Sequence, residues 1–112
     1  MKTKIFTIPT NEIVDWQTFH SVFRSILGFP AFYGCNMDAW IDCMSYLDDP
    51  PSGMTTSFVA AGEFAVLRID DAASFMRRCP EQYEALIECA AFVNNRRVTA
   101  GGEPILTLML VG

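Results

Sequence analysis

The sequence has little of what metal centres and nucleic-acid binding require. It contains one histidine, and its four cysteines, at positions 35, 43, 79 and 89, form no C-x-x-C pair. We therefore expect no structural metal site and reduced thiols rather than disulfides. Eight basic residues stand against 13 acidic ones, for a net charge of −5. Phosphate contacts need clustered lysine and arginine, so this balance favours a basic protein partner over direct nucleic-acid binding.

Signals for membranes, secretion and cofactors are also absent from the sequence. The N-terminal stretch lacks an apolar run followed by a small-residue cleavage site, and no segment is long enough to cross a bilayer, which predicts a cytoplasmic protein. Gly101-Gly102 precedes a predicted strand, the wrong context for a phosphate-binding loop, so no cofactor is expected. With 112 residues and 51% hydrophobic content, the chain should form one domain, residues 1–112, and a monomer.

Periodicity predicts three strands joined by helices. The strands are expected at 2–8, 64–69 and 104–111, with the middle one central and buried on both faces. The helices are expected at 16–27, 37–47, 72–77 and 80–96, whereas 56–60 is either a short edge strand or part of an ordered loop. His20 lies at the edge of the first helix's apolar stripe and reads as a hydrogen-bonded residue, although no partner for it is evident nearby. The order β-α-α-β-α-α-β predicts an α/β fold with a three-stranded parallel sheet covered by about four helices.

The stretch from Phe29 to Leu47 has the most distinctive pattern, an aromatic loop that leads into a helix with two unlike faces. Gly34 permits the turn, and Asn36 is placed to cap the helix. One stripe of the helix is apolar, and the other brings Asp38, Asp42 and Ser45 together towards solvent. Asp38 suits the positive end of the helix dipole, but Asp42 lies in the helix interior, where aspartate is unfavourable.

Two interpretations of this acidic stripe remain open from spacing alone. It is either a solvated face or a docking surface for a partner rich in arginine and lysine. In the second case Phe32 and Tyr33 would supply aromatic anchors beside the carboxylates.

At these residues the sequence resembles the barstar family, small inhibitors of the ribonuclease barnase. The resemblance is carried by the residues Phe29-Pro30, Tyr33-Gly34, Asn36, Met37, Asp38-Ala39 and Asp42-Cys43. It implies the same parallel α/β fold and an inhibitor whose acidic helix and aromatic loop occupy a ribonuclease active site. Asp42 takes the family's central acidic position.

Several contacts of the family are altered. Phe32 replaces a tyrosine, Ile41 and Leu47 stand where the family has tryptophans, and Phe92 aligns with an acidic contact of the last helix. These changes indicate either a target other than barnase or a branch of the family whose partner is unknown. The acidic stripe and the resemblance together give the following candidate partner-binding residues: Phe32, Tyr33, Gly34, Asn36, Asp38, Ile41, Asp42, Ser45 and Phe92.

Two alternatives to a ribonuclease inhibitor remain. The first is a regulatory interaction module of the same fold with no ribonuclease target. The second is an enzyme with Cys35 or Cys43 as nucleophile and His20 or the paired aspartates as acid and base. No motif joins His20 to either cysteine, so we expect no catalytic residues and no enzyme activity.

Overall fold

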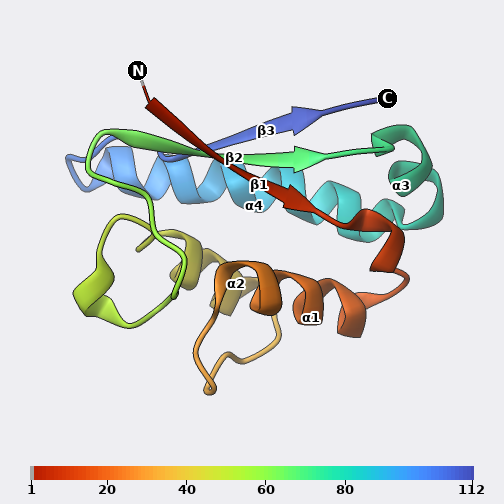
Figure 1. Ribbon diagram of the computed structural model, residues 1–112, viewed down its shortest axis with the longest axis horizontal. Helices are drawn as coiled ribbons and strands as arrows, with labels where there is room; N and C mark the ends of the chain where they lie inside the picture. Colours follow the sequence, from red (N-terminus) through yellow and green to blue (C-terminus); the bar gives the residue numbers. More distant parts are fainter. Residues whose placement is uncertain (1) are drawn as a thin grey trace.

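The computed structural model describes residues 2–112, which form a parallel sheet with helices packed on one face (Figure 1). The strands are β1 (Lys2–Ile8), β2 (Glu63–Ile69) and β3 (Leu106–Leu110), in the spatial order β1-β2-β3. Both pairings are parallel, with Phe6 opposite Leu67 and Leu67 opposite Leu108. The predicted parallel α/β fold with β2 as its central strand is confirmed.

Four α-helices connect the strands in the predicted order. They are α1 (Trp16–Leu27), α2 (Met37–Met44), α3 (Ala72–Arg78) and α4 (Pro80–Thr99), and two short 3-10 turns, η1 (Thr10–Glu12) and η2 (Pro50–Ser52), complete the chain. No helix among residues 2–112 is both long and apolar enough to span a membrane.

The core lies between the sheet and the helices. Alternate residues of β1 and β2, such as Phe6, Ile8, Leu67 and Ile69, point to that side and are buried. On the opposite face Ile5 and Arg68 are exposed, and Figure 1 shows α1, α2 and α4 on the other side of the sheet, with α3 at its end. The expectation that the central strand is covered by helices on both faces was therefore wrong.

Several predicted boundaries also needed correction. Helix α2 ends at Met44 rather than Leu47, α4 continues to Thr99, and β3 is confined to 106–110. Residues 54–62 contain no strand and form a loop that packs on the end of α1. In this loop the N–H groups of Thr56 and Ser57 both donate to the carbonyl of Leu27, each at 3.1 Å. The loop thereby satisfies a carbonyl that the end of a helix leaves without an internal partner.

Candidate functional site

The aromatic loop 28–36 projects from the side of the molecule opposite the sheet, and its inward side chains hold it in place (Figure 1). Phe29 and Tyr33 are buried, with their ring centroids 4.7 Å apart. The guanidinium of Arg24 donates to the carbonyl of Ala31 at 2.8 Å, and the N–H of Tyr33 donates to the carbonyl of Pro30 at 2.9 Å. Phe32, in contrast, is 75% exposed, so this loop presents one aromatic ring to solvent from a fixed backbone.

The buried side of the loop is tied to α1 through Tyr33 and His20. The Tyr33 hydroxyl and His20 Nδ1 share a hydrogen bond of 2.6 Å, and both side chains are buried. Burial lowers the pKa of His20 and raises that of Tyr33, so both groups are neutral at physiological pH. Tyr33 is the partner that could not be found for His20 in the sequence. Its ring positions the loop from beneath rather than projecting as an exposed anchor.

The turn into α2 contains a residue in the left-handed region, and that residue is Cys35 rather than Gly34. Cys35 has φ of 53°, whereas Gly34 is not among the glycines with positive φ. Gly34 is nevertheless close to its neighbours, because an added Cβ would lie 3.3 Å from the Asn36 side-chain nitrogen. Asn36 caps the helix as predicted, its Oδ1 accepting from the N–H of Ala39 at 2.8 Å.

Two carboxylates of α2 face solvent one helical turn apart. Asp38 is exposed in the first turn, and the side chain of Asp42 is 52% exposed. Ser45 was wrongly placed on this exposed stripe. It is buried just beyond the end of the helix, and its hydroxyl donates to the carbonyl of Ile41 at 2.6 Å. Ile41 is also buried, so neither side chain lies on the open surface.

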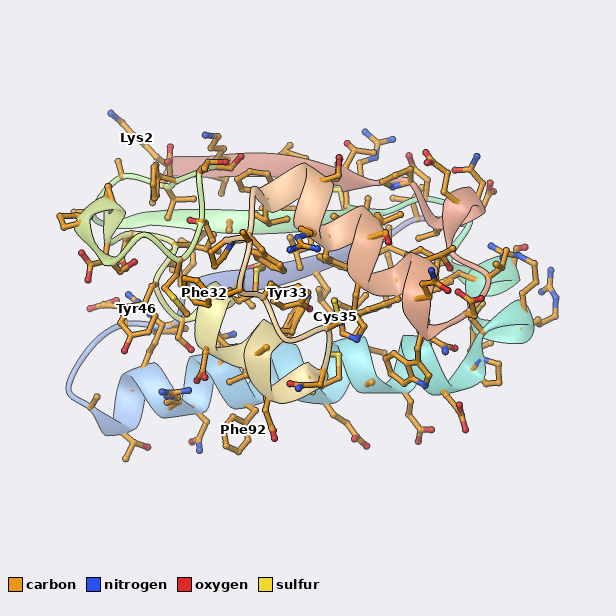
Figure 2. The ribbon with its side chains drawn as sticks, turned by 90° about the horizontal axis from the view of Figure 1, so that it is seen from below. Lys2, Phe32, Tyr33, Cys35, Tyr46 and Phe92 are labelled. Atoms are coloured by element: carbon orange, nitrogen blue, oxygen red, sulfur yellow. The ribbon has the colours of Figure 1, made fainter. Side chains whose placement is uncertain are left out.

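Helix α4 runs beside α2 and brings a cation to the acidic stripe. Arg96 Nη1 lies 2.7 Å from Oδ1 of Asp42, and this hydrogen bond raises the pKa of Arg96. Phe92, one turn earlier on α4, is 55% exposed. Figure 2 labels Phe32, Tyr46 and Phe92, which come from the loop, the residues after α2 and α4 respectively. We use the name α2–α4 face for the following exposed side chains: Phe32, Asp38, Asp42, Tyr46, Phe92 and Arg96.

Arg96 and Tyr46 were not among the candidate partner-binding residues predicted from the sequence. Asp42 and Arg96 are 54 positions apart, and only the packing of α4 against α2 brings them together. The available signal was weak: an aspartate in a helix interior together with an arginine in the last turn of another helix.

A second arginine of α4 has a different environment. Both terminal nitrogens of Arg97 donate to the carboxylate of Asp48, at 3.0 and 2.8 Å, and Nη1 also donates to the carbonyl of Ser45. The hydrogen bonds from Arg97 hold the pKa of Asp48 below its usual value. Arg97 is half-buried and holds the residues that follow α2.

The cysteines do not form a catalytic arrangement with His20. Cys35 is exposed and lines a pocket of about 250 Å³ with His20 and Trp16, but its Sγ donates to the carbonyl of Tyr33, at 3.8 Å, and not to His20. His20 Nδ1 is engaged by Tyr33. Cys43 is buried, and burial raises the pKa of its thiol to about 11, which disfavours the nucleophilic thiolate. Across residues 2–112, no three side chains of histidine, cysteine, aspartate or glutamate come together as metal ligands.

Comparison with the profiles of known protein families identifies a family for this chain. The profile of the family described as Barstar (barnase inhibitor) matches residues 3–107, nearly the whole chain. No curated protein sequence matches the chain.

Proposed function

Because the chain belongs to the barstar family, we propose that it binds and inhibits a basic ribonuclease by covering the active site of that enzyme with the α2–α4 face. The carboxylates of Asp38 and Asp42 would occupy positions where RNA phosphates bind. Phe32 would pack against the partner beside them. The observation that supports this most directly is the pair of exposed carboxylates one turn apart on α2, next to an exposed aromatic ring on a fixed loop.

The remaining candidate residues have supporting roles in this proposal. Tyr33, Gly34 and Asn36 shape the loop and the start of α2, and Ile41 and Ser45 hold the helix from its buried side. Phe92 adds exposed apolar area at the edge. The net charge of −5 would speed encounter with a basic enzyme. The cytoplasmic location, the monomeric state and the absence of enzyme activity remain predictions.

The proposal predicts that Asp42→Asn weakens binding much more than it weakens folding. Losing a half-exposed ion pair with Arg96 costs about 0.2 to 1 kcal/mol of unfolding free energy, partly offset by relief of repulsion with Asp38. Losing the contact with a partner's buried cation costs at least about 2 kcal/mol of binding free energy. Inhibition titration measures the binding loss, and melting curves measure the folding loss.

Glu12→Gln is the matched control, because Glu12 is exposed in η1 and the same charge is removed away from the α2–α4 face. Titration should include barnase and any ribonuclease encoded beside this gene. If Asp42→Asn unfolds the protein, its carboxylate is structural and the docking proposal fails. Absence of binding to every ribonuclease tested would instead favour the regulatory interaction module.

A further inference from the structure

Arg96 lines two pockets of the surface. The first, of about 430 Å³, is lined by Asp42, Tyr46, Ser52, Met54 and Arg96. The second, of about 310 Å³, includes Asp48 and Asp49 in its lining and shares Tyr46 and Arg96 with the first. Arg96 pairs with Asp42, which lines the first pocket. Of the two carboxylates in the lining of the second pocket, Asp48 pairs with Arg97 and Asp49 forms no ion pair among the described residues.

The pair between Arg96 and Asp42 has the features of a displaceable contact. A single guanidinium nitrogen meets a single carboxylate oxygen, and the two side chains are 43% and 52% exposed. Exposed pairs of this kind contribute little to stability. The neighbouring pair of Arg97 and Asp48 differs in both respects, since two nitrogens contact the carboxylate and the side chains are only 18% and 28% exposed. Arg97 is fixed, whereas Arg96 is held by one exposed bond.

This weak pair has a consequence for any cation that approaches Asp42. The guanidinium of Arg96 already occupies one oxygen of that carboxylate, and it repels a second positive charge. Asp49 offers an alternative partner. Its side chain is exposed and forms no ion pair among the described residues, and it lines the pocket on the other side of Arg96. Arginine has a long side chain with several rotamers, and Arg96 lines both pockets, so a change of rotamer would redirect its guanidinium without a movement of α4.

We propose that Arg96 is a specificity-determining residue that competes internally for Asp42 and moves to Asp49 when the cation of a partner binds. This inference rests on the proposed function in taking the partner to be basic. Partners whose cation binds Asp42 poorly fail to displace Arg96, whereas a well-matched partner does so. Arg96 thus weakens binding to basic surfaces in general. The affinity for a given partner then depends more on how well the surface of that partner fits the α2–α4 face.

The test compares Arg96→Gln with Arg77→Gln, which makes the same change in net charge on α3, where Arg77 is exposed and forms no ion pair among the described residues. Binding is measured by calorimetry with two probes, barnase and an oligoarginine peptide. We expect Arg96→Gln to bind each probe about threefold to tenfold more tightly than Arg77→Gln does, a range that corresponds to about 0.7 to 1.4 kcal/mol.

A second comparison tests the role of Asp49. Asp49→Asn should bind about threefold more weakly than the control Glu12→Gln, since the displaced guanidinium then lacks an acceptor. In the Arg96→Gln background, Asp49→Asn should not change the binding affinity further, because that variant has no Arg96 guanidinium for Asp49 to accept. A melting curve of each variant establishes that the fold is retained.

The outcomes separate this inference from the proposed function. Failure of barnase to bind counts against the proposed function and not against the competition. In that case the affinities of Arg96→Gln and Arg77→Gln for the peptide decide whether Arg96 competes for Asp42. If Arg96→Gln gains no affinity over Arg77→Gln for either probe, the competition is overturned. If Asp49→Asn weakens binding equally with and without Arg96, Asp49 acts on the partner directly and the movement of Arg96 is overturned.

Discussion

At the scale of single residues, Gly28 shows how one position can fix the arrangement of two segments. It ends α1 with φ of 67°, and an added Cβ would lie 1.6 Å from Oγ1 of Thr56. The loop that contains Thr56 donates to the carbonyl of Leu27, so the missing side chain is what allows this loop to approach the helix end. Glycine is therefore required here for two reasons, its left-handed backbone and the space it leaves.

This double requirement predicts a large loss of stability in Gly28→Ala. The left-handed backbone costs an alanine about 1 to 2 kcal/mol, and the overlap with Thr56 raises the total to at least about 3 kcal/mol. Gly53→Ala is the matched control, because Gly53 has φ of 71° and, apart from its two chain neighbours, no described residue has an atom within 4 Å of the added Cβ. Denaturant unfolding of both variants separates the two costs. Equal losses in the two variants would show that the loop moves away without penalty.

The residue scale also shows what local sequence cannot predict. The hydrogen bond of His20 with Tyr33 joins α1 to the loop after it, and neither residue type indicates its partner. The left-handed conformation of Cys35 was equally unpredictable, because glycine is the residue type expected to have positive φ in a turn, and Gly34 is its neighbour. Asn36 was predictable, since an N-cap depends only on residues within one turn.

At the scale of elements, helical and strand order followed from the sequence, but the end of α2 did not. Leu47 continues the apolar period and is fully buried, yet it lies in a turn beyond the helix. The carbonyl of Ser45 accepts from Arg97, and that of Leu47 accepts from the N–H of Val59. These partners come from distant parts of the chain, and they satisfy carbonyls that the last turn of a helix leaves without internal partners.

The pair of Arg97 and Asp48 predicts how acid acts on this junction. The pKa of Asp48 is lower in the folded chain than in the unfolded one, so its contribution to stability is present above the unfolded value of about 4. That contribution is lost as pH falls from about 4 through the folded pKa. We expect Asp48→Asn to lower the free energy of unfolding by about 1 to 2 kcal/mol at neutral pH, and by progressively less as pH falls below about 4 towards the folded pKa of Asp48.

Asp49→Asn is the control for this experiment, because its exposed side chain forms no hydrogen bond among residues 2–112. Urea unfolding at a series of pH values gives the required free energies. A difference between wild type and Asp48→Asn that is unchanged between neutral and acidic pH would contradict the ionic role of Asp48.

At the scale of the whole molecule, the candidate site combines residues that are close together in the sequence with residues that only the packing of the helices brings to it. Phe32, Asp38 and Asp42 lie within eleven positions of one another and could be proposed from the sequence. Arg96 could not, because the pair with Asp42 requires α4 to cross beside α2. The buried positions of Ile41 and Ser45 likewise depend on packing and on where α2 ends.

The whole fold also makes a prediction about its four thiols. All are free; Cys43 and Cys79 are buried, Cys89 is half-buried and Cys35 is exposed. Burial raises the pKa of Cys43 and of Cys89, which further slows reaction at these positions. Treatment with a strong reductant and a chelator should therefore leave circular dichroism and the melting temperature unchanged, because the four thiols are unpaired and residues 2–112 contain no cluster of potential metal ligands. A melting temperature several degrees lower after treatment with the reductant or with the chelator would mean that a disulfide or a metal contributes to the native state.

The difference in burial also predicts how the four thiols react. Under native conditions an alkylating reagent should label Cys35 far faster than the other three cysteines. The guanidinium-unfolded chain is the control, and it should react at all four.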